Sequence, residues 1–168
     1  MKHTASHKHI KLICISAMFA ALVFVATFLV KVPLPVGYVH IGDGIVFLAA
    51  ALLPTPYAMV AAGVGVGLAD LCAGYAAYIP ITVLIRILQV LWFSRKKPLL
   101  SWHNIVALVV SIILCAFGYW AFEAGAMYES GLAALAGVPF NIAQSAVGAI
   151  IYLVVAKTAG KWLRKAVE

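Results

Sequence analysis

A few charged and polar side chains interrupt long apolar stretches of this sequence, and their types suit ligand binding better than catalysis. Arg86 lies about eight residues from either end of an apolar segment, where a charge is costly to bury. Asp70 ends the preceding segment, and the short connection 73–77 makes the two segments neighbours. Asp70 is therefore the expected counter-ion of Arg86. Such a pair either fastens two helices together or also contacts a ligand, and both interpretations stay open.

Three further polar residues have both a structural and a functional interpretation. Asn141 and Gln144 are three residues apart, so they share one face of a helix. Their amides would either hydrogen-bond a ring-shaped ligand or tie neighbouring helices together. Asp43 begins another apolar segment, where it would either cap the free N–H groups of a helix or belong to the same site.

Aromatic residues gather near the same segment ends. Those around Glu123 form either an interface belt or a ligand cage, and they are Tyr119, Trp120 and Tyr128. Others come from loops or helix ends expected on the outer side, and they are Tyr38, His40, Tyr75 and Tyr78. Polar and aromatic groups thus collect at one end of the predicted bundle, which favours a capture site there over a continuous pore.

Several chemistries have no support in the sequence. It contains no GxxxxGK[ST] loop for ATP, no HExxH and no GxSxG, so we expect no catalytic residue and no cofactor. The cysteines Cys14, Cys72 and Cys115 lack metal-ligand spacing and are expected to be packed free thiols. His3, His7 and His9 would either bind a metal or, as we favour, belong to a basic tail near anionic lipid headgroups.

Composition places the chain in a membrane. Of its 168 residues, 65% are hydrophobic and only 10% are charged, against about 45–50% and about 25% in ordinary globular proteins. This excess excludes disorder and argues against a soluble enzyme or a nucleic-acid-binding protein. Four stretches contain no Asp, Glu, Lys or Arg, and they are 12–30, 44–69, 98–122 and 130–156. Each is close to or above the ~20 apolar residues that span a bilayer.

The sequence predicts an all-α integral membrane protein, a single domain over 1–168 with six transmembrane helices. Pro54 and Pro56 favour a turn within the second stretch, which leaves a short second helix whose start lies below the surface. A basic tail, 1–9, precedes helices at about 10–30, 42–53, 57–74, 78–93, 105–124 and 138–160.

The basic residues test this count, because Lys and Arg near span ends stay cytoplasmic. Six spans place ten of them inside, with both termini cytoplasmic: Lys2, Lys8, Lys11, Arg95, Lys96, Lys97, Lys157, Lys161, Arg164 and Lys165. Only Lys31 lies outside, whereas five spans would move two basic clusters outside. We therefore expect a multi-pass protein of a prokaryotic cytoplasmic membrane.

Four segments, in order, resemble a known family, the substrate-binding S component of energy-coupling factor (ECF) vitamin transporters. The segments are Ala17-Met18-Phe19-Ala20-Ala21, Tyr38-Val39-His40-Ile41-Gly42-Asp43-Gly44, Leu68-Ala69-Asp70-Leu71 with Gly74-Tyr75-Ala76, and Val138-Pro139-Phe140-Asn141-Ile142-Ala143-Gln144. The resemblance covers nearly the whole chain.

The resemblance implies capture of a vitamin or vitamin precursor for ATP-driven uptake, together with a membrane T component and two cytosolic ATPases. Ala17 and Ala21 would dock onto the T component, and 38–43 would belong to a gating loop. The substrate-binding residues that we expect, from the resemblance and from the residues above, are Tyr38, His40, Asp43, Asp70, Tyr75, Arg86, Glu123, Asn141 and Gln144.

A ligand with a small polar aromatic ring, such as pyridoxine or hydroxymethylpyrimidine, suits tyrosine and amide side chains best, while riboflavin and pantothenate stay open. Two other functions stay open as alternatives, a stand-alone small-solute carrier and an intramembrane lipid-modifying enzyme. A stand-alone small-solute carrier would show two comparable halves, which the sequence lacks. An intramembrane lipid-modifying enzyme would need acids on the cytoplasmic half, whereas Asp43, Asp70, Glu123 and Glu129 map to the outer side.

Overall fold

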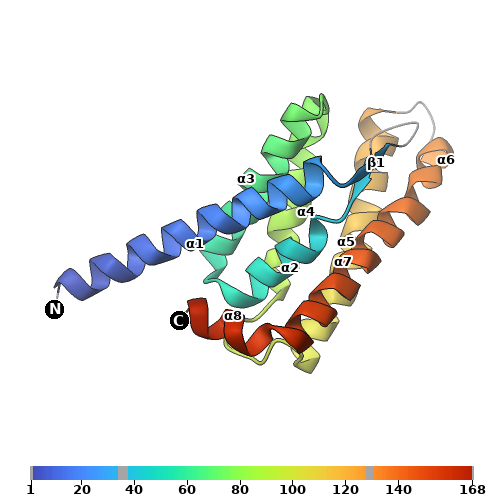
Figure 1. Ribbon diagram of the computed structural model, residues 1–168. Helices are drawn as coiled ribbons and strands as arrows, with labels where there is room; N and C mark the ends of the chain where they lie inside the picture. The colour runs from blue at the N-terminus through green and yellow to red at the C-terminus, as the bar shows by residue number, and fades with distance from the viewer. Residues whose placement is uncertain (1, 34–37, 128–130, 168) are drawn as a thin grey trace.

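The computed structural model describes residues 2–33, 38–127 and 131–167, so Tyr128 and Glu129 lie outside it, as do the side chains of 2–6. The described chain is mostly helical (Figure 1). Its elements are α1 (Lys2–Phe28), β1 (Lys31–Pro33), β2 (Tyr38–His40), α2 (Asp43–Leu52), α3 (Thr55–Cys72), the 3₁₀ turn η1 (Ala76–Tyr78), α4 (Ile79–Trp92), α5 (Trp102–Ala126), α6 (Gly131–Ala134), the 3₁₀ turn η2 (Leu135–Gly137), α7 (Val138–Thr158) and α8 (Gly160–Val167).

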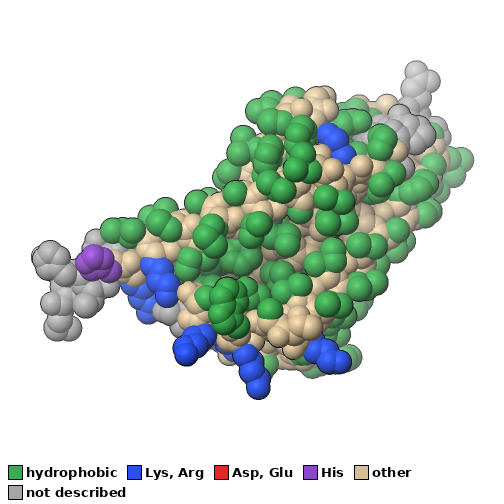
Figure 2. All heavy atoms as spheres, in the orientation of Figure 1, with side chains coloured by type: hydrophobic (Ala, Val, Ile, Leu, Met, Phe, Trp, Pro, Cys, Tyr) green, Lys and Arg blue, Asp and Glu red, His purple; other side chains and the backbone are tan. Residues whose placement is uncertain are grey.

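Within the part of the chain that the structure describes, four helices are long and apolar enough to cross a membrane. They are His7–Phe28 within α1, Thr55–Cys72, Trp102–Ala126 and Gly131–Thr158, and two shorter apolar helices accompany them, Asp43–Leu52 and Ala76–Trp92. Large apolar side chains stay exposed along them, as Ile113 and Phe117 do on α5. Figure 2 shows a largely hydrophobic face, with Lys and Arg side chains gathered toward the end where α8 lies. Such a surface suits lipid and not water.

Helix α2 occupies the centre of the bundle. Nine of its ten residues are buried, and it packs against α1, α3, α4 and α7. A helix that is apolar on all sides must be enclosed, which explains why ten residues are enough here. The chain leaves α2 through the extended residue Leu53 and enters α3 at Pro54, so the helix break lies at the prolines that predict it.

A two-stranded antiparallel sheet, which the all-α prediction lacks, joins α1 to α2. Lys31 pairs with His40 and Pro33 pairs with Tyr38. After β2 the chain turns inward, so that α2 begins inside the bundle. Gly148 of α7 permits this entry, because a Cβ there would lie 2.5 Å from the Cβ of Asp43.

The two ends of the bundle differ in character. The sheet, η1 and η2 lie at one end, which we call the hairpin end, while α8 and the turn between α2 and α3 lie at the other (Figure 1). Helix α1 begins at Lys2, whereas the sequence predicts a start at residue 10, and its N-terminal part protrudes from the bundle.

Candidate functional site

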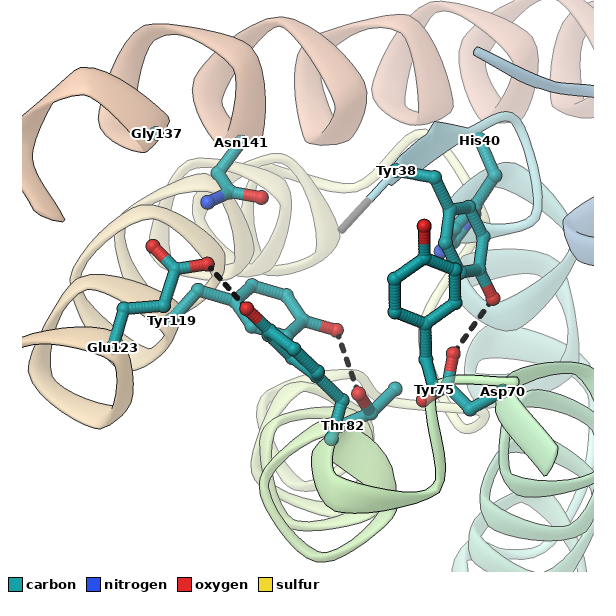
Figure 3. Close-up of a pocket in the computed structure, with 10 residues that line it drawn as sticks. Tyr38, His40, Asp70, Tyr75, Thr82, Tyr119, Glu123, Gly137 and Asn141 are labelled. Atoms are coloured by element: carbon teal, nitrogen blue, oxygen red, sulfur yellow. Dashed lines mark hydrogen bonds between the residues drawn. The ribbon is translucent and has the colours of Figure 1, made fainter. Parts of the chain in front are cut away.

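A cavity at the hairpin end collects polar and aromatic side chains from β2, α3, η1, α4, α5 and α7 and from the residue before η1 (Figure 3). Its lining residues are Tyr38, His40, Asp70, Tyr75, Tyr78, Thr82, Tyr119, Glu123, Gly137 and Asn141. The cavity volume is about 40 Å³, which holds a few water molecules. A ligand of vitamin size therefore enters only when lining side chains move.

One side of the cavity is closed by a hydrogen bond between the hairpin and α3. The Tyr38 hydroxyl donates to Asp70 Oδ1 at 2.6 Å (Figure 3). Burial, together with this bond to the carboxylate, raises the pKa of the Tyr38 hydroxyl, so it stays protonated and remains a donor. The Tyr38 ring also packs against Tyr75, with ring centroids 5.1 Å apart.

The opposite side is formed by Glu123 and Asn141 (Figure 3). Glu123 Oε1 accepts a hydrogen bond from the Tyr78 hydroxyl at 3.3 Å. Gly137 leaves room for the carboxylate, since a Cβ at this position would lie 3.0 Å from Glu123 Oε2. The chain thus places a glycine of η2 where a larger residue would press on the acid.

Arg86 does not pair with Asp70, contrary to the expectation from the sequence. Its Nη2 lies 2.8 Å from Asp43 Oδ1, and its Nη1 donates to Asp43 Oδ2 at 3.1 Å and to Gln89 Oε1 at 2.8 Å. Both charged side chains are fully buried. The reason is the inward start of α2, which brings Asp43 to Arg86 while Asp70 takes the Tyr38 hydroxyl.

Asp43 is also not a helix cap. Gly42 occupies the cap position of α2 and makes no side-chain capping hydrogen bond there. The Asp43 carboxylate is directed to Arg86 instead. Neither partner of this pair lines the cavity, so their direct contact with a ligand stays a prediction.

Gln144 and His40 hold the hairpin against α7. Gln144 Oε1 accepts from the His40 backbone N–H at 3.1 Å, and its Nε2 contacts Cys115 Sγ at 3.7 Å.

The His40 side chain is held in its neutral form. Its Nδ1 accepts from the Gly42 N–H at 3.1 Å, which requires an unprotonated Nδ1. Burial lowers the pKa of His40 to about 4, with Asp43 opposing and Arg86 reinforcing the shift, so the ring is neutral at physiological pH.

Six of the nine substrate residues predicted from sequence thus meet in the cavity: Tyr38, His40, Asp70, Tyr75, Glu123 and Asn141. The other three, Asp43, Arg86 and Gln144, lie in the buried network beside it. Thr82, Tyr78, Tyr119 and Gly137 also line it. Thr82 precedes Arg86 by one helical turn, so its spacing from Arg86 in the sequence could have identified it as a lining residue. Gly137 has no such signal in the sequence, and only its three-dimensional contact with Glu123 identifies it.

The predicted docking residues lie elsewhere. Ala17 and Ala21 are exposed and line an apolar groove between α1 and α3, together with Val60, Val64 and Leu68.

Within the described residues, no group of three or more His, Cys, Asp or Glu could hold a metal. Cys115 is buried, and Cys14 and Cys72 are exposed thiols.

The fold and the cavity define a helical protein with an apolar surface suited to a membrane and a polar, aromatic cavity at one end. The family described as ECF-type riboflavin transporter, S component, has a model that matches residues 7–161. The chain therefore belongs to this family of transporter subunits, whose members capture substrate for vitamin uptake. A search of curated proteins found no match.

Proposed function

We propose that this chain captures a small aromatic vitamin or vitamin precursor, of the pyridoxine or hydroxymethylpyrimidine type, from outside the cell. The observation that carries the proposal is the cavity at the hairpin end, which combines four tyrosines with the hydrogen-bonding side chains of Asp70, Glu123 and Asn141. Aromatic rings stack on a flat ligand, and a few fixed polar groups set its orientation.

The size of the cavity supports a single-ring ligand. With about 40 Å³ available, a pyridine or pyrimidine requires less rearrangement than the three fused rings and sugar-alcohol chain of riboflavin. The family description names riboflavin, so riboflavin is the second candidate and belongs in every binding experiment.

The hairpin acts as the gate in this proposal. Tyr38 of β2 reaches Asp70, so breaking this hydrogen bond would loosen the hairpin from α3. The hydrogen bond from the His40 backbone to Gln144 keeps the His40 end of β2 on α7 when the bond between Tyr38 and Asp70 breaks.

The proposed topology has six spans and cytoplasmic termini in the cell membrane. Helices α2 and α4 add two short spans to the four long apolar helices, which suits a bundle whose second helix starts below its surface. Lys and Arg near α8 then face the cytoplasm, and the cavity faces outward.

Uptake would require a T component and two ATPases, because the sequence has no ATP-binding loop. The exposed alanines of α1 would form the contact surface, since small residues let two helices approach closely. Ala21→Trp should then abolish assembly without changing ligand affinity. Ala121→Trp, at an exposed position of α5, is the matched control.

The test of the proposal is calorimetry on the purified chain with pyridoxine, hydroxymethylpyrimidine, riboflavin and pantothenate. We expect one single-ring ligand to bind tightly and Asn141→Ala to weaken it at least tenfold. Thr158→Ala, an exposed polar position at the other end of α7, should leave affinity unchanged. Uptake into vesicles by the chain alone would instead identify a stand-alone carrier, and binding of none of these ligands would refute the proposal that pyridoxine or hydroxymethylpyrimidine is the substrate.

A further inference from the structure

The cavity is lined by two acids and by one described base, His40, which is neutral at physiological pH. Asp70 and Glu123 both line it, whereas no described Lys or Arg does. The nearest candidates are engaged elsewhere: Arg86 pairs with Asp43, and Lys31 Nζ lies 5.4 Å from the centre of the Tyr38 ring without lining the cavity. The two charges of the Arg86–Asp43 pair offset each other, so the described lining keeps an excess of two carboxylates.

Both carboxylates are nearly buried, and that of Asp70 is only partly satisfied by hydrogen bonds. Asp70 is 4% exposed and Glu123 is 6% exposed. Asp70 Oδ1 takes the Tyr38 hydroxyl and the Thr82 hydroxyl is a further donor to this carboxylate, while Asp70 Oδ2 is buried without a hydrogen bond of normal geometry among the described residues. A buried carboxylate without a cation or further hydrogen-bond donors is costly. A ligand that carries a positive charge or N–H groups would supply what this site lacks.

The tyrosine rings fit the same ligand chemistry. Tyr38, Tyr75 and Tyr78 form a chain of ring contacts with centroids 5.1 and 6.1 Å apart. The face of an aromatic ring attracts cations, so the cavity walls and its acids favour the same sign of charge. Figure 3 shows the acids on opposite sides of the cavity, Asp70 beside Tyr38 and Glu123 beside Asn141.

We propose that the ligand is a cation, an aromatic ring that carries a protonated amine or an equivalent positive group, and that carboxylate-bearing vitamins are rejected. This inference rests on the proposed function of the cavity. It follows from the juxtaposition of two buried acids with tyrosine faces, because an anion would meet two like charges in a poorly solvated space. Pantothenate is thereby excluded, and neutral riboflavin is disfavoured.

Three pyridines that differ only at ring position 4 test the charge directly. Pyridoxamine carries an aminomethyl group, pyridoxine a hydroxymethyl group and 4-pyridoxate a carboxylate. We expect calorimetry at pH 7 to give an affinity order of pyridoxamine, then pyridoxine, then 4-pyridoxate, with at least a tenfold step at the first change. Riboflavin and thiamine complete the panel as a large neutral ring system and a large cation.

The carboxylates are tested by Asp70→Asn and Glu123→Gln. Each should reduce the preference for pyridoxamine over pyridoxine about tenfold, because a charge-assisted hydrogen bond becomes a neutral one. The preference, not the absolute affinity, is the readout. The ligand series on the unaltered protein decides the question even where a variant fails to fold.

Each outcome has a defined meaning. Tightest binding of pyridoxamine or thiamine supports the inference. Equal or tighter binding of pyridoxine, 4-pyridoxate or riboflavin overturns it but keeps the chain as a substrate-capture subunit. Binding of no member of the panel overturns both this inference and the proposed ligand class.

Discussion

Arg86 of α4 and Asp43 of α2 form a fully buried ion pair in the interior of the bundle, with Nη2 2.8 Å from Oδ1. The pair extends to Gln89, whose amide Nε2 donates to the Ser111 carbonyl of α5 at 2.9 Å. Helices α2 and α4 are thus joined by the ion pair itself, and α5 is joined to them through the Gln89 amide. Arg86 lies one helical turn along α4 from Thr82 of the cavity lining, and its contact with Asp43 holds the start of α2, which follows the hairpin.

Breaking this pair on one side should destabilise the fold strongly. Asp43→Asn leaves a buried guanidinium without its counter-ion, at a cost of about 3–5 kcal/mol. The double variant Asp43→Asn, Arg86→Met should recover part of that loss, since it removes both charges. Thermal unfolding in detergent measures the effect, and losses that add in the double variant would contradict a coupled pair.

The hydrogen bond between Tyr38 and Asp70 should govern ligand entry. Tyr38→Phe keeps the ring and removes the donor, so the hairpin loses its bond to α3 and ligand association should become faster. Stopped-flow binding measures the rate. Tyr57→Phe removes a hydroxyl that contacts His9 Nδ1 at 2.8 Å, away from the cavity, and should leave the rate unchanged. An unaltered rate for Tyr38→Phe would show that the gate lies elsewhere.

Gly137 should be intolerant of a side chain. In Gly137→Ala the new Cβ would meet Glu123 Oε2 at 3.0 Å, so the carboxylate must shift within the cavity. Overpacking of about 1–2 kcal/mol corresponds to a roughly tenfold loss of ligand affinity. Gly125→Ala, whose added Cβ meets nothing within 4 Å, is the control, and equal affinities for the two variants would remove Gly137 from the site.

The elements of the fold were largely predictable because apolar length and proline have local consequences. The break at Pro54 and the enclosed short helix α2 follow from residues that are adjacent in the chain. The sheet between Lys31 and His40 was not predicted, since three-residue strands carry little periodic signal. The start of α1 at Lys2 differs from the predicted start at about residue 10, because the basic residues that precede this position suit a helix as well as a tail.

The partners of the site residues were less predictable than the residues themselves. Burial cost singled out Arg86 and Asp70 correctly as unusual, but nearness in sequence suggested the wrong pair. Asn141 and Gln144 share a helix face, yet Asn141 lines the cavity while Gln144 binds the His40 backbone. Which of two neighbouring groups reaches a cavity depends on the inward turn after β2, a long-range feature.

Acid should weaken the fold through His40. Its pKa is lowered by burial from 6.5 to about 4, so the unfolded chain binds the proton more readily than the folded one. Stability is then complete above about pH 6.5 and falls as the pH drops toward 4, by at most about 1.4 kcal/mol per pH unit. Below that window both states are protonated, and this contribution stops changing.

The contribution of His40 can be isolated by substitution. His40→Asn retains an acceptor near the position of Nδ1, where the Gly42 N–H donates, but does not titrate. Unfolding midpoints of this variant should therefore depend less on pH between 4 and 6.5 than those of the unaltered chain. His103→Asn, at an exposed position, should keep the full dependence. If both variants lost the same pH dependence, another group would be responsible and the neutral state of His40 would not stabilise the hairpin.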